Sequence, residues 1–130
     1  MRVFETRVRW RTRLRFFEQG TRNRLVDEGT YERLASAAFS RLLDLFEAIE
    51  PEEAEVESAG DVIRIDLRDG KRIVLNTQRP ARQIWLAGGQ SAWHFSYDDA
   101  TQRWLDDKGR GELFDAVRSL TRASGVELPG

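Results

Sequence analysis

A series of short runs with the two-residue period of β-strands fills the middle of the chain. The runs lie at residues 54–58, 62–67, 72–76, 83–87, 92–97 and 103–105. In the second run Ile63, Ile65 and Leu67 occupy alternate positions, so their side chains share one face of a strand. Asp69-Gly70 is a strong hairpin signal, and Gly88-Gly89 separates the fourth run from the fifth. Runs spaced this closely predict one antiparallel sheet of five or six strands.

Amphipathic helices are predicted before and after these strands. The first begins near Thr30, with Thr30 or Gly29 as its cap, and Pro51 marks its end. Its apolar stripe consists of Leu34, Ala38, Phe39, Leu42, Leu45, Phe46 and Ile49. The second helix covers residues 112–123, and its stripe consists of Leu113, Val117 and Leu120, with Phe114 and Ala116 at the edges. Two helices can cover only one face of the sheet, so we predict an α+β fold, a two-layer helix–sheet–helix sandwich with one sheet face open to water.

The residue types that are missing exclude several kinds of chemistry. The chain has no cysteine, which rules out disulfides, thiolate metal ligands and cysteine nucleophiles. His94 is the single histidine, and without a nucleophile or a partner acid it makes a poor active site. No apolar run approaches the ~20 residues that cross a bilayer. We therefore expect a soluble protein that is not an enzyme and has no membrane partner.

Positive charge is concentrated in residues 1–29, which contain eight arginines and four acids, whereas residues 30–130 carry a net charge of −5. Arginine alternates with mostly apolar residues from Arg7 to Phe16, which is a strand period. We interpret residues 1–29 as a basic extension, either an extra edge strand or a disordered tail, and residues 30–130 as the folded domain. Binding of an anionic polymer or membrane surface is an open alternative for this arginine-rich arm. A transit peptide is less favoured because the arm carries acids and little serine, and a mis-assigned start is also open.

Seven carboxylates gather around the end of the first helix and the first strand: Asp44, Glu47, Glu50, Glu52, Glu53, Glu55 and Glu57. We call these seven residues the acidic ridge. Asp44 and Glu47 are one helical turn apart, and Glu53, Glu55 and Glu57 should project from one strand face. Crowded carboxylates repel one another, so a bound cation or a basic partner would stabilise them, and oxygen ligands suit hard ions such as Fe²⁺, Fe³⁺, Mn²⁺ or Ca²⁺. A solvated acidic surface without a ligand is the plainer interpretation.

Trp85 stands out on the sheet face that the helices leave bare. If Ile84 and Leu86 point at the helices, Trp85 shares the opposite face with Asn76, Gln83, Ala92, His94 and Ser96. A large aromatic ringed by uncharged hydrogen-bonding groups is typical of a protein-binding hot spot. Lateral packing between neighbouring strands is the alternative explanation for this tryptophan.

The run NTQRPARQIWLA at residues 76–87 resembles the frataxin family, especially its bacterial (CyaY) branch. The pattern is N-x-Q-x-P-x-x-Q-x-W-L-[AS], and it is followed by a small-residue turn, His94-Phe95 and Trp104. The resemblance extends over residues 30–130 and implies a frataxin-like fold. It also implies a non-enzymatic role in iron–sulfur cluster assembly, as an iron-binding regulator or iron donor.

The resemblance also implies which residues act. The acidic ridge would bind iron weakly and would meet the cysteine desulfurase. Asn76, Gln78, Gln83, Trp85 and His94 would contact the cluster scaffold protein. Leu45, Phe46 and Ala48 interrupt the acids at the helix end, which points to weak iron binding.

Other functions and states are left open by the sequence. A ferroxidase or iron-storage protein is one alternative, although a ferroxidase needs a closed pair of metal sites. An acidic interaction module without a metal is another. We expect a monomer, with iron-dependent oligomers as an alternative, and no nucleic-acid partner for the domain. A bacterial member would act in the cytoplasm and a eukaryotic one in the mitochondrial matrix.

Overall fold

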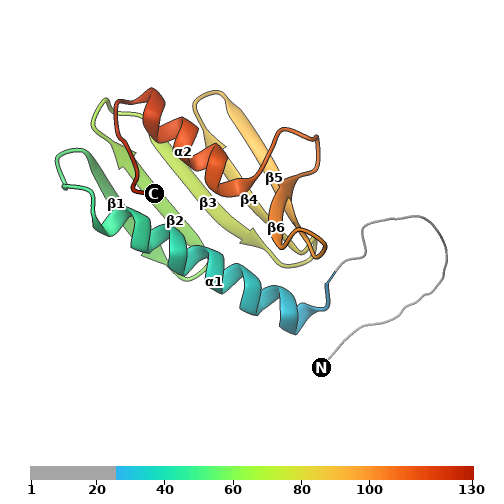
Figure 1. Ribbon diagram of the computed structural model, residues 1–130. Coiled ribbons are helices and arrows are strands. Elements are labelled where there is room, and N and C mark those ends of the chain that lie inside the picture. Colours follow the sequence, from blue (N-terminus) through green and yellow to red (C-terminus); the bar gives the residue numbers. More distant parts are fainter. Residues whose placement is uncertain (1–25) are drawn as a thin grey trace.

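Six strands form one antiparallel sheet, and both helices lie on the same side of it (Figure 1). The computed structural model describes residues 26–130, so the interpretations of the arginine-rich arm lie outside the described residues. The elements are α1 (Glu28–Glu47), β1 (Ala54–Ala59), β2 (Val62–Leu67), β3 (Arg72–Gln78), β4 (Gln83–Gly88), β5 (Ser91–Asp98), β6 (Arg103–Asp106) and α2 (Leu113–Ala123). The strands follow one another across the sheet in sequence order. The predicted two-layer α+β sandwich is confirmed.

The turn between β2 and β3 is the predicted Asp-Gly hairpin. Gly70 has a φ of 89°, a conformation that a residue with a Cβ rarely adopts. The Asp69 carboxylate accepts a hydrogen bond of 3.1 Å from the Lys71 amide, which closes the turn. This turn sets Asp66 opposite Arg72 and places Ile63, Ile65 and Leu67 on the face that the helices cover.

The first helix begins earlier than predicted. Its N-cap is Asp27, whose carboxylate accepts a 2.8 Å hydrogen bond from the Thr30 amide, so the predicted cap at Gly29 or Thr30 is wrong. Aspartate is among the strongest N-cap residues, and it lies before both of the residues we considered. The helix ends at Glu47, and Ile49 therefore packs on the core from the turn that follows.

The core differs from the predicted stripes at several positions. On α1 the buried set includes Tyr31 and Ala35, which were not predicted, whereas Leu45 is only half-buried. On α2 Thr121 is fully buried and Leu120 is half-buried. Leu120 instead covers Gly88, where an added Cβ would come within 2.8 Å of a Leu120 methyl group. The glycine pair that we interpreted as a turn thus also lets the strand approach the helix.

A C-terminal segment without regular structure completes the core. Val126 and Leu128 are buried, and the segment runs back into the space between the two helices (Figure 1). Arg118 of α2 holds it there, because its guanidinium donates a 2.9 Å hydrogen bond to the Leu128 carbonyl. The sequence did not predict this layer, since two apolar residues outside a periodic run carry no signal.

Tyr31 connects α1 to β4 of the sheet, and we expect its hydroxyl to contribute measurably to the free energy of unfolding. The hydroxyl donates a 2.6 Å hydrogen bond to the Gln83 carbonyl, and the ring lies edge-on to Trp104 with a centroid distance of 6.1 Å. Replacing Tyr31 with phenylalanine should lower the free energy of unfolding by about 1 kcal/mol, because the partly buried carbonyl loses a donor. Urea denaturation measures this change.

Tyr97 offers the matched control for this substitution. Its ring also lies edge-on to Trp104, at 5.4 Å, but its hydroxyl makes no hydrogen bond within residues 26–130. Tyr97→Phe should therefore change the free energy of unfolding by less than about 0.5 kcal/mol. Equal losses for the two variants would contradict a specific contribution from the Tyr31 hydroxyl.

Candidate functional site

One row of side chains crosses the bare face of the sheet and contains Trp85. The strand register pairs Ala59 with Val62, Val62 with Asn76, Asn76 with Trp85, and Trp85 with His94. The row therefore extends from β1 to β5 on the side away from the helices. Val62, which we did not predict as a site residue, is 40% exposed and gives the row a second apolar surface beside Asn76. We call these five residues the Trp85 row.

Trp85 is held by its neighbours rather than standing free. Its ring stacks on the His94 ring, with centroids 4.3 Å apart and planes inclined by 17°. Its indole N–H donates a 2.8 Å hydrogen bond to the side-chain oxygen of Gln83. Because the polar edge is satisfied within the chain, the remaining exposed surface of this half-buried residue is the aromatic ring itself.

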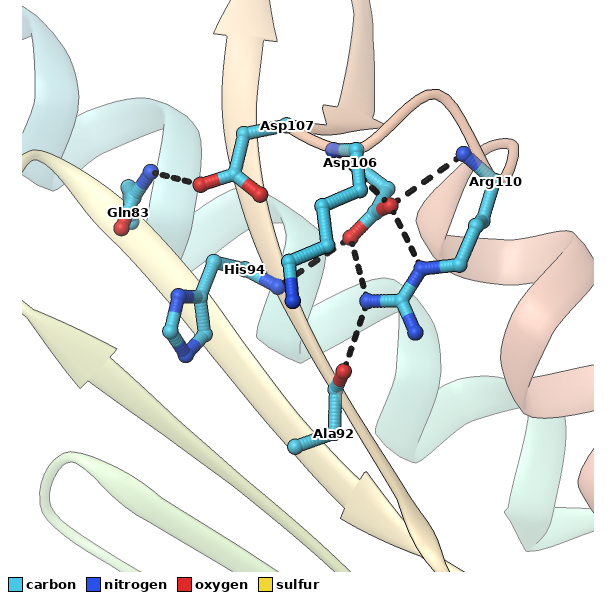
Figure 2. A network of polar contacts seen from close by, with 7 residues as sticks. Gln83, Ala92, His94, Asp106, Asp107 and Arg110 are labelled. Carbon is cyan, nitrogen blue, oxygen red and sulfur yellow. Dashed lines mark hydrogen bonds and ion pairs between the residues drawn. The ribbon is translucent and has the colours of Figure 1, made fainter.

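Gln83 is in turn fixed by two acceptors. Its amide nitrogen donates to the Ser96 hydroxyl at 3.1 Å and to the Asp107 carboxylate at 3.5 Å. Figure 2 shows the contact with Asp107 on the side of the strand where His94 lies. The resemblance implies that Gln83 contacts a partner, which stays a prediction, and in the structure Gln83 orients Trp85. The other two predicted residues lie close by, since Gln78 pairs with Gln83 and the Asn76 side chain donates to the Thr77 carbonyl at 3.2 Å.

The acidic ridge follows the end of α1, the turn after it and the edge strand β1. Asp44 and Glu47 lie on α1, Glu50, Glu52 and Glu53 lie in the turn, and Glu55 and Glu57 lie on β1. All seven are exposed except Glu53, which is half-buried. Glu53 precedes the strand in which we had placed it. Glu55 and Glu57 lie opposite Asp66 and Arg64, so they belong to the same bare sheet face as Trp85.

Two of the ridge acids already have cationic partners. Glu57 forms an ion pair with Arg64, and Glu53 lies 3.9 Å from the Arg68 guanidinium. Within residues 26–130 no three acidic or histidine side chains converge on one point that could hold a metal ion. The ridge is thus a spread negative surface, and the geometry offers no closed ligand cage.

Behind the Trp85 row a buried carboxylate pairs with a partly exposed arginine, which the sequence did not reveal. The Asp106 side chain is fully buried and accepts hydrogen bonds of 2.9 and 3.2 Å from the Arg110 guanidinium (Figure 2). The same carboxylate accepts from the amides of Lys108, Arg110 and His94 at 3.1, 3.2 and 3.3 Å. Burial works against ionisation of Asp106, but the hydrogen bonds from Arg110 and from the amides outweigh it and lower the pKa of the carboxyl.

Arg110 extends this network to the neighbouring strand. Its guanidinium donates a 2.7 Å hydrogen bond to the Ala92 carbonyl and lies 5.4 Å from the centre of the Trp93 ring. Together with the bond from the His94 amide, these contacts fix the part of β5 on which Trp85 stacks. An aspartate followed by Gly109 and Gly111 was the available signal in the sequence.

The fold and these surfaces define a helix–sheet–helix domain of the frataxin type. The profile of the frataxin-like domain matches residues 24–125. A protein named "Iron-sulfur cluster assembly protein CyaY" from Cupriavidus metallidurans is 30% identical over 107 residues, which are 79% of this chain and 95% of the relative. A protein of the same name from Shewanella sp. (strain ANA-3) is 32% identical over 102 residues, covering 75% of this chain and 92% of the relative. The chain belongs to the frataxin/CyaY family.

Solved structures agree with this fold. Frataxin from Psychromonas ingrahamii superimposes with a TM-score of 0.68 at 18% identity, covering 78% of this chain and 94% of that one. Trimeric yeast frataxin complexed with ferrous iron superimposes with a TM-score of 0.57 at 21% identity, covering 80% and 91% of the two chains. In the part of the chain that the structure describes, neither helix is long and apolar enough to cross a membrane.

Proposed function

We propose that this protein is a non-catalytic binding protein of iron–sulfur cluster assembly, which contacts its partners through two adjoining surfaces. The name of its relatives, "Iron-sulfur cluster assembly protein CyaY", supports the process. The observation that carries the proposal is Trp85, a large aromatic on a bare sheet face whose polar edge is already bonded to Gln83. A ring fixed in this way loses little conformational freedom on binding, which favours a docking anchor.

The Trp85 row, with Gln78 and Gln83 at its border, would receive the cluster scaffold protein. Val62 and the Trp85 ring provide the apolar centre, and Asn76 and His94 provide hydrogen-bonding groups around it. An apolar centre with a polar border is the usual composition of a protein interface.

The acidic ridge would meet the basic surface of a cysteine desulfurase and bind iron weakly. The frataxin from yeast has been crystallised with ferrous iron, which supports iron as a ligand in this family. Among residues 26–130, the ridge carboxylates that form no ion pair are Asp44, Glu47, Glu50, Glu52 and Glu55. Iron would be cargo or a signal on this surface, and we propose no oxidation step.

Neutralising three unpaired ridge acids should weaken desulfurase binding without affecting scaffold binding. For the triple variant Glu47→Gln, Glu50→Gln, Glu52→Gln we expect about a tenfold loss of affinity at low salt, since each exposed charge contributes modestly. The loss should shrink as the salt rises from about 50 to about 300 mM, because screening already weakens the contact of the unchanged protein. Calorimetric titration with each purified partner measures both affinities.

A second triple variant removes the same charge from acids that are held in ion pairs. Asp61, Asp66 and Asp69, which lie outside the acidic ridge, contact Arg79, Arg72 and Lys71. Their amide variants should weaken desulfurase binding by less than about threefold. Equal losses in the two triple variants would show that net charge alone matters. If a lysate pull-down with the unchanged protein recovered neither the desulfurase nor the scaffold, the proposed function would be rejected.

A further inference from the structure

An open cavity of about 560 Å³ lies on the helix side of the sheet, opposite the face that carries the Trp85 row. Its walls come from α1, β6, α2 and the C-terminal segment, and they include Arg41, Arg103, Trp104, Phe114, Arg118 and Gly130. Arginines from three well-separated parts of the sequence thus line one space beside α1 and α2. Its volume lies in the range of small-molecule binding sites.

The cationic groups of this cavity are poorly neutralised. Within residues 26–130 no carboxylate forms an ion pair with Arg41, Arg103 or Arg118. Arg41 lies over the Phe114 ring at 4.3 Å, and Arg118 donates to the carbonyls of Leu128 and Pro129. These contacts orient two guanidinium groups while leaving their charges uncompensated.

The acids of the cavity do not cancel this charge. Glu112 is buried, and its carboxylate caps α2 by accepting from the amides of Phe114 and Asp115. Asp115 is exposed and forms no ion pair among the described residues, and Arg122, a fourth arginine, is paired with Glu127 at 2.9 Å. The cavity therefore has the opposite polarity to the acidic ridge.

We propose that this cavity binds a small anion that carries two or more carboxylate or phosphate groups. Arginine recognises both groups through paired hydrogen bonds of its planar guanidinium. Arg41 and Arg103 would each take one end of the anion, while Trp104 and Phe114 form an apolar wall beside it. The site is independent of the proposed contacts with the desulfurase and the scaffold.

The test is an NMR titration of the full chain with inorganic pyrophosphate and, separately, with the tricarboxylate tricarballylate. We expect saturable shifts of the Trp104 indole and Gly130 amide signals with at least one of the two anions. Tighter binding of pyrophosphate would assign the site to phosphates, and tighter binding of tricarballylate would assign it to carboxylates. Shifts that stay linear with both anions would overturn the proposal.

Matched double variants distinguish anion binding in this cavity from non-specific attraction of the anion to arginines elsewhere in the chain. Arg41→Gln with Arg103→Gln should weaken binding about tenfold or more, because two charge-assisted hydrogen-bonding groups are lost. Arg9→Gln with Arg11→Gln removes the same charge from the arginine-rich arm and should change the affinity by less than about twofold. If the arm variant lost as much affinity as the cavity variant, the anion would be binding elsewhere.

Discussion

Trp85→Ala is expected to weaken binding to the cluster scaffold protein about 30-fold or more. Aromatic anchors at the centre of an interface typically contribute about 2 kcal/mol or more, which corresponds to this loss of affinity. The free energy of unfolding should fall by only about 1 kcal/mol, because Trp85 is half-buried and loses mainly its stack on His94. Calorimetric titration with the scaffold and urea denaturation measure the two effects.

Trp85→Phe is the informative companion of this variant. It keeps an aromatic ring over His94 and removes the N–H that donates to Gln83. If the ring surface is the anchor, the phenylalanine variant should retain most of the affinity that the alanine variant loses. Unchanged scaffold affinity in Trp85→Ala, combined with a loss of more than about 3 kcal/mol in stability, would identify Trp85 as a packing residue instead.

The bare sheet face was predictable because alternation on a strand is a strict geometric rule. Ile84 and Leu86 had to share one face, which placed Trp85 on the other, and the structure buries both aliphatic residues. The same rule set Glu55 and Glu57 on one face of their strand. Alternation alone could not show that Glu55 and Glu57 share a sheet face with Trp85. Their common face depends on the register from β1 through β2 and β3 to β4.

The features that the sequence did not reveal depend on contacts between distant or irregular segments. Val126 and Leu128 lie outside any periodic run, so their burial follows only from the tertiary fold. The Asp106–Arg110 pair joins the end of β6 to the loop after it, where charged residues usually face solvent. The same limit applies to the candidate site. Strand alternation put Gln83 on the same face as Trp85, but it could not predict the hydrogen bonds by which Gln83 holds the indole in place.

The ion pair behind the Trp85 row should be the most sensitive point for stability. Asp106→Ala is expected to lower the free energy of unfolding by about 3 kcal/mol at neutral pH, because it leaves the Arg110 guanidinium and three backbone amides without their acceptor. Arg110 remains partly exposed, so water compensates some of this loss. Asp107→Asn, the same loss of charge at the exposed neighbouring residue, should change stability by less than about 0.5 kcal/mol.

The same pair gives a pH dependence with a defined sign. Because the folded-state pKa of Asp106 lies below its value in the unfolded chain, the stabilising charge is fully present above the ordinary aspartate pKa of about 3.9. It is lost as the pH falls through the lowered folded-state pKa. The difference in unfolding free energy between the unchanged protein and Asp106→Asn should therefore stay constant from about pH 7 to about pH 5 and shrink in stronger acid. Other carboxyl groups titrate in both proteins and largely cancel in this difference, so urea denaturation at several pH values isolates Asp106. A difference that persisted unchanged at about pH 2 would mean that the hydrogen-bonding geometry of the loop, and not the charge of Asp106, holds the strand beneath Trp85.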